Sequence, residues 1–153
     1  MLALAPVWAA ACFGDGKQPN NINIGNGWYN LERSPDNKNW WIWTKDKGEF
    51  VIEPGSEMVL TLRGGVGSIE RPNKVNVLIN GNAVKTLEVT GDKYEQKPIE
   101  PITFTFKQGK NTIEFVSANK AVKIPTDTRE LAIAVDNITL TNADGSVKFE
   151  LPQ

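Results

Sequence analysis

Short segments in which apolar and polar residues alternate run through most of the chain, and they restrict its fold more than any other feature. Apolar residues recur at every second position at Val75/Val77/Ile79, Phe104/Phe106 and Ile113/Phe115. This period of two gives a β-strand one face that packs on a core, and no window carries the stripe typical of a helix. The expected strands are residues 28–32, 40–45, 49–52, 57–63, 74–79, 83–89, 102–106, 112–117, 131–140 and 147–151.

Turn residues separate these strands at regular intervals. Asn80-Gly81 is the strongest hairpin signal, because both residues tolerate positive φ. The segments Gln108-Gly109-Lys110-Asn111 and Asp144-Gly145 are expected to join their neighbouring strands in the same way. About ten short strands with turns roughly every 8–12 residues predict an all-β sandwich or barrel.

Three longer connections interrupt the pattern, at 34–39, 64–73 and 118–129. In a sandwich such connections gather at the ends of the sheets. They carry function more often than the strands do.

Composition agrees with one globular domain and excludes several classes of function. A chain of 153 residues has the length of about one domain. It has 17 basic and 18 acidic residues and no basic run, so we expect no nucleic-acid partner. It has no histidine, which excludes Ser-His-Asp and Cys-His catalysis and histidine-containing zinc sites. The single cysteine, Cys12, excludes an intrachain disulfide.

The chain divides into three parts by polarity. Residues 1–12 form an apolar arm, and residues 13–26 form a polar lead that we expect to be a linker or a loop lying on the surface. The β-sandwich domain is expected to occupy residues 27–153.

The apolar arm has three interpretations, which the sequence leaves open. It is shorter than the roughly 20 residues that span a bilayer. Ala9-Ala10-Ala11-Cys12 resembles a lipoprotein cleavage box with Cys12 as the lipidated residue, but no basic residue precedes it and Ala9 stands where the box has Leu. Alternatively, the arm is a loosely attached start, or it adds as a strand to a neighbouring subunit. The large residues of such an assembly arm are Leu2, Leu4, Val7 and Trp8.

Three of the five tryptophans lie in Trp40-Trp41-Ile42-Trp43-Thr44. In a strand, Trp41 and Trp43 share one face, and Trp40 shares the other with Ile42. We expect Trp41 and Trp43 to face the core. Trp40 is then expected to be an exposed platform, or a contact beneath a loop or the arm.

A change of register within 131–140 predicts a β-bulge. The apolar positions are odd-numbered up to Val135 and even-numbered from Ile138, so the pattern slips by one residue at Asp136-Asn137. Asp136 is either a bulge residue that bonds its own backbone or a ligand for a structural calcium ion, Ca2+.

Several motifs resemble known jelly-roll families. The segments 107–115 and 134–140 resemble the closing half of galactose-binding-like jelly rolls, many of which are carbohydrate-binding modules. The segments 27–32, 41–44 and 125–131 are similar to jelly-roll modules found beside or fused to bacterial membrane glycosyltransferases, although Ile42 stands where that pattern has Arg. The resemblance implies an antiparallel jelly-roll sandwich of about 8–10 strands.

Sugar binding needs aromatic rings beside planar polar groups, because a sugar stacks its apolar face and hydrogen-bonds its hydroxyls. Alternatively, the tryptophans are core residues, and Glu32 pairs with Arg129 in a structural network that Asp127 joins. Glu32 and Asp127 are not expected to be a glycosidase pair, because a small sandwich offers little wall for a deep active site. The candidate ligand-binding residues are Trp28, Tyr29, Glu32, Asn39, Trp40, Trp41, Asp127 and Arg129.

The sequence therefore favours a non-catalytic, extracytoplasmic β-sandwich, without a cofactor other than the calcium considered above, that binds a glycan or polysaccharide at a tryptophan-lined surface. The alternative is a structural subunit of a cell-surface filament or coat that assembles through residues 1–12. Membrane attachment is expected only through a lipid anchor on Cys12.

Overall fold

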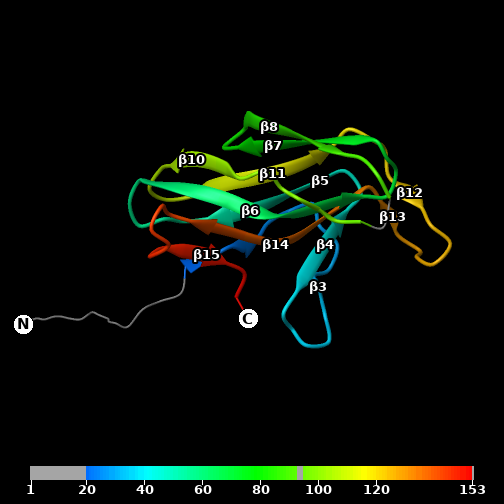
Figure 1. Ribbon diagram of the computed structural model, residues 1–153, viewed down its shortest axis with the longest axis horizontal. Helices are drawn as coiled ribbons and strands as arrows, with labels where there is room; N and C mark the ends of the chain where they lie inside the picture. Colours follow the sequence, from blue (N-terminus) through cyan, green and yellow to red (C-terminus); the bar gives the residue numbers. More distant parts are fainter. Residues whose placement is uncertain (1–19, 93–94, 153) are drawn as a thin grey trace, which may run out of the picture.

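Two large β-sheets, which overlap in the view of Figure 1, and a small two-stranded ribbon make up the described part of the protein. The computed structural model describes residues 20–92 and 95–152, where every regular element is a strand. Among the described strands, all pairs are antiparallel except that of β1 (Asn20–Asn21) with β15 (Lys148–Glu150). The predicted all-β antiparallel sandwich is confirmed.

The first sheet has eight strands and is built around β14 (Ile133–Thr141). β6 (Met58–Ser68) pairs along one edge of β14, while β4 (Trp40–Thr44) and β15 (Lys148–Glu150) pair with successive parts of the other edge. The remaining strands of this sheet are β1 (Asn20–Asn21), β3 (Glu32–Arg33), β9 (Lys97–Pro98) and β10 (Ile102–Phe106).

The second sheet has five strands and covers the inner face of the first. Its order is β2 (Asn23–Ile24), β5 (Lys47–Ile52), β11 (Asn111–Ser117), β7 (Asn73–Ile79) and β8 (Asn82–Val89). A separate two-stranded ribbon pairs β12 (Val122–Lys123), within the connection expected at 118–129, with β13 (Glu130–Leu131), which follows that connection.

Strand β4 turns the opposite face to the core from the one that we predicted. Trp40 is 8% exposed and Ile42 is fully buried, whereas Trp41 and Trp43 are half-buried on the outer face. Alternation decides which residues share a face but not which face is inside. The face that carries Trp40 and Ile42 is inside because the Trp40 ring packs edge-on against Phe50 of β5, with ring centroids 6.1 Å apart. The prediction of a core-facing Trp41 and an exposed Trp40 is therefore wrong.

The predicted turns have two outcomes. Asn80 and Gly81 have φ of 52° and 84° and form the hairpin between β7 and β8, and Asp144-Gly145 turns β14 into β15, as predicted. The turn at Gly109 instead connects β10 in the first sheet to β11 in the second. The prediction of a hairpin there is wrong, because β10 and β11 pair with strands of different sheets and not with each other.

The predicted bulge is confirmed, and a predicted loop is a strand. The β14 register with β6 shifts between Asp136 and Thr139, and Asn137 has a φ of 50°. Residues 64–68, expected to begin a long connection, continue β6 and pair with β14. A glycine-rich segment predicts a loop, but here Gly65 and Gly67 leave room for the side chains of Asp136 and Gln96, which lie above them.

Residues 20–24 belong to the sheets rather than to the expected lead at 13–26. Asn20 pairs with Phe149, Asn23 pairs with Val51, and Ile22 between them is fully buried. Burial of the apolar Ile22 side chain anchors this otherwise exposed segment to the sheets.

The predictions for the arm lie outside the described residues. They concern Cys12 as a lipidation site and Leu2, Leu4, Val7 and Trp8 as assembly residues, and they stay predictions. Within 20–92 and 95–152, no helix has the length and apolar character needed to cross a membrane.

Candidate functional site

A hollow on the outer face of the first sheet begins beside Trp41 and Trp43. Across the strands, Trp41 is level with Asp136 and Gly65, and Trp43 is level with Ala134 and Gly67. Each row thus passes from a large ring to small residues, which leaves space beside the rings. The resulting tryptophan hollow has a volume of about 410 Å³ and is lined by Asn39, Trp40, Trp41, Trp43, Ile69, Gln96, Ile124, Ala134, Asp136 and Asn137.

Two glycines of β6 form the floor under the polar part of this hollow. A Cβ atom on Gly65 would lie 2.2 Å from Asp136 Oδ1, and one on Gly67 would lie 1.6 Å from Gln96 Oε1. Both distances are shorter than any non-bonded contact allows. The Asp136 and Gln96 side chains can therefore occupy their positions only above glycine.

Four polar side chains form a connected cluster beside the tryptophans. Gln96 Nε2 donates to Asp136 Oδ1 at 2.9 Å, and Asn137 Nδ2 donates to Asp136 Oδ2 at 3.1 Å. Asn137 also donates to Asn39 Oδ1 at 3.2 Å and accepts the Trp40 backbone N–H at 3.0 Å. Burial raises the pKa of the Asp136 carboxyl above its ordinary value, and the two amide donors partly oppose that rise.

The contacts of Asp136 do not fit a calcium site. Its two oxygens face amide nitrogens, whereas calcium takes six to eight oxygen ligands. Over the part of the chain that the structure describes, no group of three or more acidic, histidine or cysteine side chains could hold a metal. The Asp136 carboxylate accepts from the side chains of Gln96 and Asn137, whereas one of our two interpretations had it bonding its own backbone. Calcium binding stays a prediction that this geometry does not favour.

A second polar cluster ties the connection before β13 to β3. Arg129 Nη2 donates to Asp127 Oδ2 at 2.7 Å, and Nη1 lies 3.2 Å from Glu32 Oε2. The guanidinium stands 5.3 Å from the centre of the Tyr29 ring, and the Tyr29 hydroxyl donates to the Glu130 carbonyl. The predicted pairing of Glu32, Asp127 and Arg129 is confirmed. Contact of these three side chains with a ligand stays a prediction.

The arginine holds its partner carboxylate in the charged form. The hydrogen bonds from Arg129 lower the pKa of the Asp127 carboxyl to about 2. This cluster adjoins the tryptophan hollow, because Glu32 is level with Trp41 across β3 and β4.

Trp28 has a structural role in the described fold. Its ring packs 5.0 Å from Phe50, its Nε1 donates to the Glu49 carbonyl at 2.9 Å, and it lies over Gly48. Only Glu32 and Arg33 of the neighbouring region form a strand, so the strand expected at 28–32 is mostly absent.

The structure thus divides the eight predicted ligand residues into two groups. Asn39, Trp40 and Trp41 line the tryptophan hollow, whereas Trp28, Tyr29, Glu32, Asp127 and Arg129 do not. The period of two could have added Trp43, which shares a face with Trp41, and the bulge could have added Asn137. Nothing in the local sequence marks the other lining residues that we missed, Ile69, Gln96, Ile124 and Ala134.

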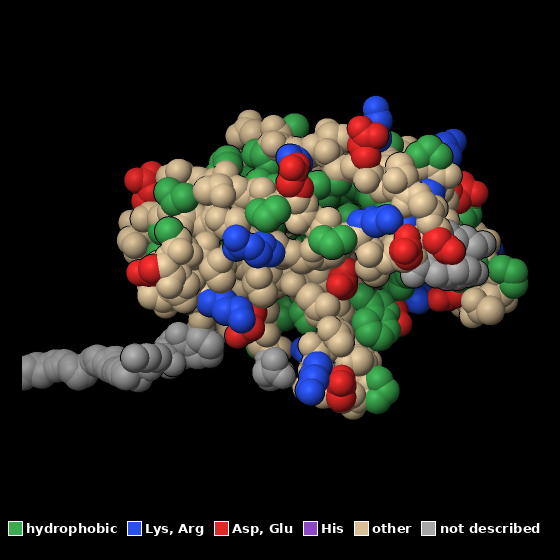
Figure 2. Space-filling view, viewed as in Figure 1, with side chains coloured by type: hydrophobic (Ala, Val, Ile, Leu, Met, Phe, Trp, Pro, Cys, Tyr) green, Lys and Arg blue, Asp and Glu red, His purple; other side chains and the backbone are tan. Residues whose placement is uncertain are grey.

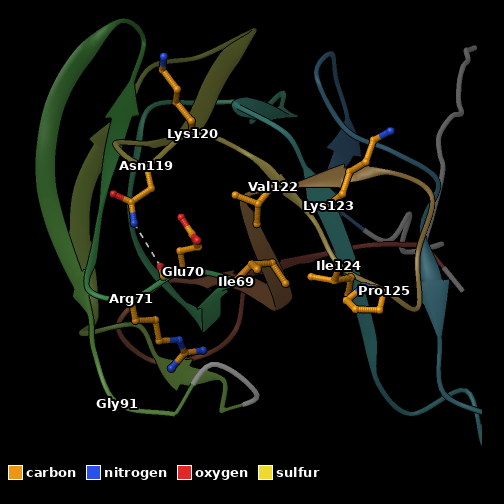
Figure 3. A pocket seen from close by; sticks show the side chains of 10 residues that line it. All are labelled: Ile69, Glu70, Arg71, Gly91, Asn119, Lys120, Val122, Lys123, Ile124 and Pro125. Carbon is orange, nitrogen blue, oxygen red and sulfur yellow. Dashed lines mark hydrogen bonds between the residues drawn. The ribbon is translucent and has the colours of Figure 1, made fainter.

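A larger hollow of about 800 Å³ adjoins the first and shares Ile69 and Ile124 with it. In Figure 3 the side chains of Ile69, Val122, Ile124 and Glu70 point towards its middle, while Lys120 and Lys123 point away. Arg71 donates to the carbonyls of Ser68, Thr90 and Glu95. Arg71 therefore joins the segments around this hollow.

Charge is mixed on the face of the molecule shown in Figure 2. Basic and acidic side chains lie next to one another there, with apolar side chains between them. Lys85 pairs with Glu100, and Lys97 pairs with Glu95.

No family model and no curated protein matches the chain. Among solved structures, it is similar to a family 35 carbohydrate-binding module from Clostridium thermocellum, with a TM-score of 0.45, 15% identity, and coverage of 80% of this chain and 89% of that one. A family 35 carbohydrate-binding module from an environmental isolate gives a TM-score of 0.45 and 19% identity, covering 76% and 91% of the two chains.

A third similar structure is a cycloisomaltooligosaccharide glucanotransferase from Paenibacillus sp., complexed with cycloisomaltoheptaose. Its TM-score is 0.47 at 12% identity, and the match covers 80% of this chain but 17% of the enzyme. The expected association with membrane glycosyltransferases stays a prediction. At these scores the similarities assign neither a family nor a ligand, and the function proposed below rests on the geometry of the site.

Proposed function

We propose that the protein is a non-catalytic carbohydrate-binding module that holds a sugar in the tryptophan hollow. The observation that carries the proposal is the placement of Trp41 and Trp43 side by side on the outer face, level with a polar cluster. This combination suits a sugar, because a pyranose ring has an apolar face and a rim of hydroxyl groups.

The polar groups of the hollow match the rim of a sugar. The amides of Asn39, Gln96 and Asn137 are planar and carry both donors and acceptors, and the Asp136 carboxylate accepts. They occupy one part of the lining, while Ile69, Ile124 and Ala134 give the rest an apolar character. A sugar in this hollow would stack on a ring and reach the amides with its hydroxyls.

The carboxylates outside the hollow support a binding role rather than hydrolysis. Glu32 and Asp127 both bond to Arg129, so they are partners of one cation and not an acid and a base across a cleft. With a pKa of about 2, Asp127 stays ionised near neutral pH and cannot be a general acid. We further propose that the module acts outside the cytoplasm, where polysaccharides are exposed.

Affinity electrophoresis in gels that contain soluble polysaccharides tests this function. We expect at least one polysaccharide to retard the protein, and Trp41→Ala and Trp43→Ala each to weaken retardation by about tenfold or more, as for a buried aromatic anchor. Trp28→Phe is the control, because this tryptophan packs on Phe50 and lies outside the lining. The proposal fails if no polysaccharide retards the protein, or if both alanine variants migrate like the wild type.

A further inference from the structure

We propose that Asp136 determines which sugars bind: the tryptophan hollow takes a neutral sugar that donates two hydroxyl hydrogen bonds to this carboxylate, and it discriminates against sugars that carry an acid group. This inference rests on the proposed function, because it names the ligand class of the same hollow. It assigns to Asp136 a role as specificity-determining residue.

The hydrogen bonds of Asp136 leave room for two further donors. An ionised carboxylate offers about four acceptor positions, two on each oxygen. Gln96 uses one position on Oδ1, and Asn137 uses one on Oδ2. One position on each oxygen therefore remains for a ligand. Two neighbouring hydroxyls of a sugar present two donors at a spacing that suits the two oxygens of one carboxylate.

The carboxylate is held in place before any ligand arrives. Its Oδ1 lies over Gly65, where a Cβ atom would displace it, and the end of the Gln96 side chain lies over Gly67 in the same way. Asn137 is fixed in the bulge by the Trp40 backbone N–H and by Asn39. A sugar would thus meet a preformed acceptor and would not have to order it, which lowers the cost of binding.

The charge of the lining selects against acidic sugars. Among the described residues that line the hollow, Asp136 is the only one with a charge, and none is Lys or Arg. Arg129 beyond Trp41 already pairs with Asp127 and Glu32, and Lys120 and Lys123 point away from the adjoining hollow (Figure 3). An acidic ligand would place a like charge beside a partly buried carboxylate, in a lining that holds no Lys or Arg to offset the repulsion.

Two comparisons test the inference. The first measures wild-type retardation by neutral polysaccharides, such as galactomannan, xyloglucan and β-glucan, and by the acidic polymers polygalacturonate and alginate. We expect at least one neutral polymer to bind about tenfold or more tightly than either acidic polymer. Equal or tighter binding of an acidic polymer would overturn the inference, and this test needs no variant to fold.

The second comparison uses Asp136→Asn, which keeps the shape of the side chain but replaces one acceptor oxygen with an NH2 group. Because a hydrogen bond to a charged group is lost, we expect binding of the neutral polymer to weaken by about tenfold or more. Asp144→Asn, a matched change in an exposed turn, should bind like the wild type. Melting curves of both variants check that each is folded.

The outcomes separate this inference from the proposed function. If Trp41→Ala and Trp43→Ala abolish binding but Asp136→Asn binds like the wild type, the module binds carbohydrate and Asp136 is not its specificity residue. If the tryptophan variants also bind like the wild type, or if nothing binds, the proposed function is wrong and this inference with it.

Discussion

At the scale of single residues, Trp40 and Trp41 are neighbours with opposite roles. Trp40 is 8% exposed and packs edge-on against Phe50, while Trp41 lies half-buried on the outer face beside Asp136. The first ring holds the two sheets together. The second offers its surface to the hollow.

This difference predicts a difference in stability between two matched variants. Trp40→Ala should lower the free energy of unfolding by about 3–5 kcal/mol, the range for removing a large buried aromatic side chain. Trp41→Ala should cost less, because part of its ring is already in water. Urea unfolding followed by circular dichroism measures both values. A larger loss for Trp41→Ala would contradict the observed orientation of β4.

The glycines of the floor give a second residue-scale prediction. A methyl group at Gly67 would displace the end of the Gln96 side chain and break its bond to Asp136. Gly67→Ala should therefore weaken carbohydrate binding while the melting temperature changes little, since the displaced group is exposed. Gly55→Ala is the control, because a Cβ there meets open space. Unchanged binding by Gly67→Ala would show that Gln96 does not position Asp136.

At the scale of elements, the connection after β12 is fastened to β3 by one arginine. Arg129 bonds Asp127 in its own segment and Glu32 in β3, and it covers the Tyr29 ring. Ile124, in the same connection, forms part of the wall of the tryptophan hollow. The arginine cluster therefore supports one side of the site without lining it.

This fastening should be sensitive to acid. The Asp127 carboxyl has a folded-state pKa of about 2 against an ordinary value of 3.8. A lowered pKa contributes stability that is complete above the ordinary value and is lost as the pH falls towards about 2. The wild type should thus be more stable than Asp127→Asn at neutral pH, and the difference should shrink below about pH 4. Melting temperatures of both proteins across this range test it, and a constant difference would contradict the assigned pairing.

The sequence predicted the elements better than it predicted the faces of the sheets. Strands such as Ile102–Phe106 were predicted correctly, because the alternation of apolar and polar residues along a strand is a local signal. The inward face of β4 depends on Phe50 of another sheet, and the strand at 64–68 depends on β14, so neither is encoded locally. The same holds for Gln96, which enters the site only through its contact with Asp136.

At the scale of the whole molecule, the core and the proposed binding site use opposite faces of one sheet. The inner face of the first sheet buries Trp40, Ile42 and Val135 against the second sheet. Its outer face exposes Trp41, Trp43 and Asp136 in the tryptophan hollow. The bulge in β14 contributes to both, because Asn137 bonds the Trp40 backbone and the Asp136 carboxylate.

Chemical shifts of the tryptophan indole N–H groups test the location of the site most directly. The ¹⁵N-labelled protein is titrated with an oligosaccharide of a polysaccharide that retards it, with indole signals assigned by single Trp→Phe variants. We expect the signals of Trp41 and Trp43 to shift in proportion to the bound fraction, while that of Trp28, whose Nε1 bonds the Glu49 carbonyl, stays in place. Saturable binding that leaves the Trp41 and Trp43 signals unmoved would show that the sugar binds elsewhere.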